Sequence, residues 1–282
     1  MQTFISYDGT RLAYHEKGSG APLVCVPGGP GRASAYLGDL GGLSAHRRLI
    51  LLDNRGTGDS AAPADPQTYR CDRLVDDVEA LRSHLGLERI DLLAHSASGN
   101  VATLYAARHP HRLSRMVLVA PGWRATGLPF SDDEWLAAIR RRADEPWYAE
   151  AHAALMRLND GDVTPANRRI ASPLFFGRWN AAAVAFAETD EAQRSPAANA
   201  GFGVPGTFGD PDRTRAALTA LAAPVLLLGG DLDPAPTVRL LEEFAALFPS
   251  GQLTIQPHAG HVPWVDDPAA FTTTVAAFLD HA

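Results

Sequence analysis

A short segment with two serines, DLLAHSASGN at residues 91–100, has residue types and spacing that suit nucleophilic chemistry. Ser96 follows an apolar run typical of a buried strand and precedes a segment with helical spacing. A sharp turn from strand to helix lifts a serine hydroxyl clear of a sheet, provided that the residues two positions away on either side are small. Ala94 and Ser98 meet that requirement. We therefore predict Ser96 as a nucleophile.

Ser98 is the competing nucleophile in the same segment. Its flanking residues would be Ser96 and Asn100, and Asn100 is bulky for a position that packs closely. We assign Ser98 to the turn instead, where its hydroxyl is expected to bond a free N–H at the start of the helix. A structural role for both serines, as helix caps, is the alternative.

The acid and the base that a serine nucleophile needs occur later in the chain. GGDLDP places Asp233 at the end of one apolar run, and HAGHVPW places His261 just beyond the next run. A serine hydroxyl becomes a strong nucleophile when a histidine accepts its proton, and a carboxylate fixes the tautomer of that histidine. We predict these roles for Asp233 and His261, with Asp231 and His258 as the near alternatives.

Attack on a carbonyl carbon also requires N–H donors for the oxygen that becomes negatively charged. The loop VPGGPGR at residues 26–32 follows an apolar run, and its glycines let the backbone approach a substrate closely. Gly29 keeps an N–H, whereas Pro27 and Pro30 have none. We predict the N–H groups of Gly29 and Ala97 as the two oxyanion-hole donors.

Short apolar runs that alternate with helical segments must position these residues. The runs PLVCVPGG, RLILLDNRG, RIDLLAHS and RMVLVAPG have the continuous apolarity of strands buried on both faces of a parallel sheet. The pattern stops after Pro121 and resumes with APVLLLGG. This alternation predicts an α/β fold with a doubly wound, mostly parallel sheet. We expect residues 1–122 and 223–282 to form its core and residues 123–222 to form an inserted helical cap.

Composition limits the classes of function. The chain has 282 residues with 46% hydrophobic and 20% charged residues, which is typical of a globular protein. Its net charge of −7 argues against a nucleic-acid partner, because such proteins carry a basic face. The N-terminal segment reads as two short strands around an Asp-Gly turn, and no apolar run reaches the ~18 residues of a membrane span. With only two cysteines, these features predict a cytoplasmic protein without membrane contact.

Three further features of the sequence bear on metal, phosphate and partner binding. The histidines are scattered without metal-ligand spacing, so we expect no metal. LDNRGTGDS lacks the residue order of a phosphate-binding loop, and we expect Asp53 and Arg55 to tie loops together near the site. The basic run Arg140–Arg142 has two interpretations, a solvated helix face or a docking site for an acidic partner such as a carrier protein.

Together these motifs resemble the α/β-hydrolase superfamily, and within it the proline iminopeptidase-like branch. The matching segments, spread between Phe4 and Phe278, are VPGGPG, LDNRGTGDS, AHSASGN, GGDLDP and AGHVPW. The resemblance implies the α/β-hydrolase fold, a serine hydrolase with a helical cap, and no cofactor. It further implies removal of an N-terminal aminoacyl group by amide hydrolysis, from a small-molecule or short peptide-like substrate.

Two departures from the branch affect the expected substrate. Its aminopeptidases hold the substrate's α-ammonium group with acidic residues, and Pro234 and Gly201 occupy the corresponding positions here. A buried ammonium group needs a counter-charge, because burying an unpaired charge is costly. Glu188, Asp190 and Asp231 are the candidates for that charge, and the alternative is that all three are surface acids.

Aromatic residues are concentrated in the predicted cap. They are Trp123, Trp135, Trp147 and Trp179, with Phe175 and Phe176 close by. Such residues either form the core of the cap or line an apolar pocket. We expect Trp123 and Trp179 to contact substrate, which suits a lipophilic biosynthetic intermediate. The alternatives are an esterase, thioesterase or lactonase on an apolar substrate, and a catalytically silent binding protein.

Overall fold

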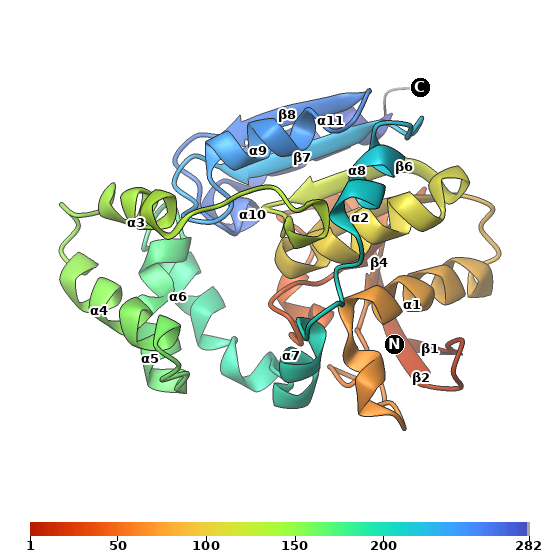
Figure 1. The fold of residues 1–282 in the computed structure, drawn as a ribbon, viewed down its shortest axis with the longest axis horizontal. Helices are drawn as coiled ribbons and strands as arrows, with labels where there is room; N and C mark the ends of the chain where they lie inside the picture. Colours follow the sequence, from red (N-terminus) through yellow and green to blue (C-terminus); the bar gives the residue numbers. More distant parts are fainter. Residues whose placement is uncertain (281–282) are drawn as a thin grey trace.

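A sheet of eight strands forms the centre of the computed structural model, which describes residues 1–280 (Figure 1). The strands are β1 Gln2–Ile5, β2 Arg11–Lys17, β3 Pro22–Val26, β4 Arg48–Leu52, β5 Ile90–His95, β6 Leu113–Val119, β7 Val225–Gly230 and β8 Gly251–Gln256. Their order across the sheet is β1-β2-β4-β3-β5-β6-β7-β8. β2 is antiparallel to both neighbours, and β3 through β8 run parallel. The predicted mostly parallel sheet and the N-terminal strand pair are confirmed.

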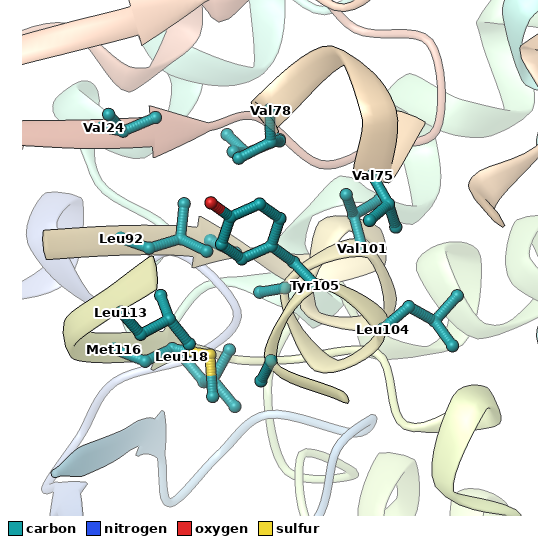
Figure 2. Close-up of a cluster of buried hydrophobic side chains, with 14 of the residues drawn as sticks. Val24, Val75, Val78, Leu92, Val101, Leu104, Tyr105, Leu113, Met116 and Leu118 are labelled. Atoms are coloured by element: carbon teal, nitrogen blue, oxygen red, sulfur yellow. The ribbon is translucent and has the colours of Figure 1, made fainter. Parts of the chain in front are cut away.

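Alternate residues of the central strands pack on opposite faces of the sheet. Val24 and Leu92 belong to a buried cluster that includes side chains of the helices α1 Cys71–His84 and α2 Gly99–Arg108, and Figure 2 shows this cluster around Tyr105 of α2. Leu93, the next residue of β5, packs instead with α11 Pro268–Asp280 on the other face. Each fully buried Leu or Val contributes about 1.5 to 3 kcal/mol. Burial of both faces explains why the strands read as continuous apolar runs.

The segment between β6 and β7 is helical, as expected. Its helices are α3 Asp132–Arg140, α4 Tyr148–Asn159, α5 Pro165–Ala171, α6 Ala181–Glu188, α7 Pro196–Phe202 and α8 Pro211–Leu218; α9 Val238–Ala245 and α10 Pro263–Asp266 follow later. α3 to α5 share a small core of their own, against which Trp135 and Trp147 pack. α8 contacts α2 beside the sheet (Figure 1). The division into core and cap at residues 122 and 223 stays a prediction.

The basic run at the end of α3 is not a uniformly solvated face. Arg142 is buried, where its guanidinium donates to the backbone oxygen of Phe176 and lies over the ring of Trp147. Arg141 donates to the backbone oxygen of Asp231. The interpretation as a solvated face is therefore wrong for Arg142, because its partners come from segments that the local charge pattern does not reveal. Docking of a carrier protein here stays a prediction.

Asp53 and Arg55 anchor different parts of the fold. Asp53 accepts a hydrogen bond from the backbone N–H of Ser34, just after the loop 26–32, so its predicted role in tying loops is confirmed. Arg55 is fully buried and donates from Nε to Asp77 in α1 at 2.8 Å and from Nη1 to Asp8 at 2.7 Å. It therefore joins α1 to the turn between β1 and β2 rather than a loop beside Ser96.

Among the described residues, no helix is long and apolar enough to cross a membrane.

Asp77→Ala is expected to lower the free energy of unfolding by about 3 to 5 kcal/mol, because it leaves the Arg55 guanidinium buried without its main counter-charge. Urea unfolding followed by circular dichroism measures this. Glu243→Ala, which removes one member of a half-exposed pair with Arg239, is the control and should cost about 1 kcal/mol or less. Equal losses in the two variants would contradict this account of the buried pair.

Candidate active site

Ser96 lies on a sharp turn at the end of β5. Its backbone φ of 53° is in the left-handed region, and the turn Ser96–Ser98 leads directly into α2. The neighbouring loop approaches closely: a Cβ on Gly28 would lie 2.6 Å from the Cβ of Ser96, so only glycine fits there. A strained residue held by a packed loop is the arrangement that the strand-turn-helix pattern predicts for Ser96.

Ser96, His261 and Asp233 form a continuous hydrogen-bonded chain. The Oγ of Ser96 is 2.8 Å from Nε2 of His261, and Nδ1 of His261 is 2.8 Å from Oδ2 of Asp233. Asp233 follows β7 and His261 follows β8, and the Asp233 side chain is fully buried. The structure thus brings together the three residues predicted from the sequence. In this geometry His261 can accept the serine proton while Asp233 holds its ring.

The alternative residues have other contacts. Ser98 is buried and donates its hydroxyl to the backbone oxygen of Pro27 at 2.6 Å. Its predicted bond to a helix N–H is wrong, because the hydroxyl is directed to the loop after β3 and makes no capping hydrogen bond to α2. Asp231 accepts from the backbone N–H of Ala259, and His258 is exposed. None of the three side chains joins the chain of hydrogen bonds from Ser96.

The environment of His261 favours its charged form. Burial lowers the pKa of this imidazole, but the adjacent Asp233 carboxylate outweighs burial and holds the pKa above its usual value. His261 therefore gains its proton more readily than an isolated histidine. It must be neutral to accept the proton of Ser96, so the reactive form prevails as the pH rises through the raised pKa.

A second network, which the sequence analysis missed, joins His95 to the loops on either side. Its Nε2 is 2.8 Å from the backbone oxygen of His261 and must therefore carry the proton. Its Nδ1 then accepts from the hydroxyl of Tyr36 at 2.8 Å, and that hydroxyl accepts from the N–H of Gly28 at 2.6 Å. Burial, followed by the proximity of His261, lowers the pKa of His95 well below its usual value. The position of His95 directly before Ser96 is the sequence feature that could have indicated a role for His95 at the site.

This network bears on the predicted oxyanion-hole donors. The N–H of Gly28 is already donated to Tyr36, which leaves Gly29 as the donor closest to the end of β3. Gly29 lines a cavity together with Ser96 and His261, and Ala97 lines a second cavity with the same two residues. The roles of Gly29 and Ala97 stay predictions that this placement supports.

Two cavities meet at Ser96 and His261. The first, here called the cap cavity, has about 300 Å³ and is lined by Phe175, Phe176 and Phe186 among others. The second has about 420 Å³ and is lined by Trp123, with Phe202 and Phe208. Trp179 packs on Phe176 and does not line either of these two cavities. The structure therefore brings Trp123 to Ser96, whereas Trp179 lies behind the cavity wall.

The acids predicted to hold an ammonium group are dispersed. Glu188 is exposed and lines a separate surface depression. Asp231 lines neither cavity beside Ser96. Asp190 lines the cap cavity, but its carboxylate is already paired with Arg32 and Arg194. These two arginines were not predicted from the sequence, although Arg32 ends the loop 26–32.

One group of side chains departs from the expectation that no metal-binding cluster is present. Ligand atoms of His15, Asp53 and Asp59 lie within 4.8 Å of one another among the described residues. The Asp53 carboxylate already accepts from the backbone N–H groups of Ser34 and Asp59. The Asp53 carboxylate is therefore already engaged by hydrogen bonds within the protein, and we assign this group of three side chains a structural role.

An NMR pH titration should give His261 a pKa above the usual value of about 6.5. Asp233→Asn removes the charge that stabilises the imidazolium while burial remains, so the pKa of His261 should fall by roughly one unit or more. Asp231→Asn is the matched control and should leave it unchanged. The same His261 pKa in wild type and Asp233→Asn would contradict the assigned coupling.

Comparisons with known proteins agree with this geometry. The chain matches the family model for the alpha/beta hydrolase fold over residues 21–268. It is 24% identical to a proline iminopeptidase of Heyndrickxia coagulans over 98% of each chain, and 29% identical to a putative carbamate hydrolase of Caulobacter sp. over 94% of this chain and 95% of that one. The structure of an esterase from Rhodococcus sp. ECU1013 matches with a TM-score of 0.73 and 25% identity, covering 99% of this chain and 98% of the esterase. The chain therefore belongs to the alpha/beta hydrolase fold family.

Proposed function

We propose that this chain is a serine hydrolase that forms an acyl-enzyme on Ser96. The observation that carries the proposal is the chain of two 2.8 Å contacts from Ser96 through His261 to Asp233. As Ser96 attacks a carbonyl carbon, His261 accepts its proton and Asp233 stabilises the imidazolium. His261 then protonates the leaving group. Water, deprotonated by His261, hydrolyses the acyl-enzyme and frees Ser96.

The loop after β3 and the start of the turn at Ser96 supply the proposed oxyanion hole. Donors that point at the developing negative charge are each worth about 3 kcal/mol of transition-state stabilisation. The N–H groups of Gly29 and Ala97 are our candidates, because both residues line cavities that contain Ser96. The proposed steps use only groups of the chain, the substrate and water.

The side chains that line the two cavities support an ester with an apolar part as the preferred substrate. Aromatic and aliphatic side chains dominate the walls of both cavities, which suits an apolar acyl or leaving group. Of the acids expected to hold an ammonium group, only Asp190 lines the cap cavity, and two arginines already neutralise it. The esterase, thioesterase or lactonase alternative therefore has more support than an aminopeptidase.

Amide hydrolysis after an N-terminal aminoacyl group is the second candidate. The similarity to a proline iminopeptidase over nearly the whole of both chains favours it. The apolar cavities would then hold the lipophilic part of an aminoacyl-bearing intermediate. This candidate requires a counter-charge for the ammonium group beyond the Asp190 carboxylate.

The deciding experiment compares kcat/KM for three substrates: an aryl ester, a free aminoacyl anilide and the N-acetylated form of that anilide. We expect Ser96-dependent turnover of the ester, with Ser96→Ala slower by about 10⁴-fold or more. We expect acetylation to change the anilide rate by less than tenfold. A preference of tenfold or more for the free amine, about 1.4 kcal/mol, would instead support the aminopeptidase.

Fluorophosphonate labelling tests the nucleophile without a substrate. Wild type should be labelled and Ser96→Ala should not, because only an activated serine reacts with such a probe. Ser98→Ala is the matched control and should still be labelled. No labelling of wild type, together with no turnover of any of the three substrates, would point to a catalytically silent binding protein.

Tyr36→Phe should lower kcat by roughly tenfold while KM changes little. Loss of the hydroxyl leaves the Gly28 N–H and the His95 Nδ1 without their shared partner, at a cost of about 1 to 3 kcal/mol. The loop that carries Gly29 then loses a fixed contact. Tyr14→Phe is the control, since the hydroxyl of Tyr14 bonds to Gln2 on the N-terminal strands. An unchanged kcat in Tyr36→Phe, or an equal fall in both variants, would show that Tyr36 does not position the site.

A further inference from the structure

One wall of the cap cavity carries a pair of arginines around a single acid. Arg194 donates to the Asp190 carboxylate from Nε at 2.6 Å and from Nη2 at 2.9 Å. Arg32 approaches the same carboxylate at 3.2 Å. All three residues line the cavity that contains Ser96 and His261. Two positive side chains and one negative side chain leave this wall with an excess positive charge.

Neighbouring groups do not cancel that excess. Arg168 also lines the cavity, but it forms its own pair with Glu191 and adds no net charge. The faces of Tyr36 and Phe186 lie 4.4 and 4.8 Å from the Arg32 guanidinium carbon. Aromatic faces attract a cation but do not neutralise it. The pKa of Arg32 is lowered by burial despite the presence of Asp190, which agrees with an incompletely compensated charge.

The two arginines have donors to spare. The Arg32 guanidinium donates one N–H to Gln193 and one to Thr189, besides its contact with Asp190. Arg194 directs only Nε and Nη2 to Asp190. A guanidinium has more N–H groups than these contacts use, and its planar geometry matches a carboxylate. Burial strengthens such an interaction, because less water competes for the charges.

We propose that Arg32 and Arg194 form a carboxylate-binding subsite, so that the preferred substrate is an ester whose portion in the cap cavity also carries a free carboxylate. The proposal rests on the proposed function and specifies its substrate class. The apolar walls would hold the chain between the reacting carbonyl at Ser96 and the carboxylate at the arginines. An ammonium group in the same place would meet like charges and be rejected.

The roles of the two arginines separate in variants. Arg32 joins the loop 26–32 to the segment 189–193, so its loss would also disturb the backbone near Gly29. Arg194→Gln removes one charge and leaves the contact between Arg32 and Asp190. Asp190→Asn has the opposite effect on the charge of the cavity wall, because loss of the carboxylate raises the excess positive charge. The two variants therefore have opposite expected effects on an anionic substrate.

The experiment uses three 4-nitrophenyl esters with acyl chains of matched length: hexanoate, the monoester of adipic acid and 6-aminohexanoate. The carboxylate oxygens and the ammonium nitrogen lie the same number of bonds from the ester, and the neutral chain ends in a methyl group at the preceding position. Wild type should favour the carboxylate ester over the neutral ester by tenfold or more in kcat/KM, and the ammonium ester should be poorest. Arg194→Gln should abolish that preference, Asp190→Asn should increase it, and Arg194→Lys should restore part of it. Arg213→Gln, at an exposed arginine outside both cavities, controls for net charge.

The outcomes separate the subsite from the proposed function. Ser96-dependent hydrolysis of the neutral ester with no preference for the carboxylate would overturn the subsite and leave the hydrolase proposal standing. Calorimetry on Ser96→Ala supplies a readout without turnover: monomethyl adipate should bind at least tenfold more tightly than methyl hexanoate. If no ester is hydrolysed but this difference is found and disappears in Ser96→Ala/Arg194→Gln, the subsite stands and the proposed function fails. Equal binding of the two ligands would overturn the subsite whatever the activity.

Discussion

The alignment of parallel strand ends is the constraint on which the rest of the site depends. Ser96 follows β5, Asp233 follows β7 and His261 follows β8, so three loops meet at one edge of the sheet. The strand between them contributes as well, because the N–H of Gly122 after β6 donates to the backbone oxygen of Ser96 at 2.7 Å. A change of register in any of these strands would displace one member of the hydrogen-bonded chain.

The loop after β3 couples the proposed oxyanion hole to the predicted cap. Its Gly31 oxygen accepts from the N–H of Ser195, and the N–H of Ala33 donates to the backbone oxygen of Gln193, at 2.7 and 2.8 Å. The same loop carries Gly29 toward Ser96 and Arg32 toward the cap cavity. Displacement of the segment 193–195 would therefore alter both the charge that meets the substrate and the backbone beside the nucleophile.

The buried polar groups near Ser96 divide into two sets with different electrostatics. His261 is paired with the fully buried Asp233, which favours a positive charge on its ring. His95, one residue before the nucleophile, has no such carboxylate and is held neutral by burial. The two imidazoles have ring centres 5.1 Å apart, so a single charge between them can be stabilised more easily than two. The arrangement leaves His261 as the proton acceptor and His95 as a fixed contact.

The sequence by itself determined the sheet, the turn at Ser96 and the order of the acid and the base. Continuous apolar runs and small residues such as Ala94 report burial and local backbone shape, which depend on neighbours in the chain. Tertiary structure alone decided the contacts of Ser98, Arg142 and Asp190. Arg32, for example, bonds to Thr189, 157 positions away. Residue spacing gives no information about which distant segment comes within hydrogen-bonding distance of a polar side chain, and so the charge of the cap cavity could not be predicted.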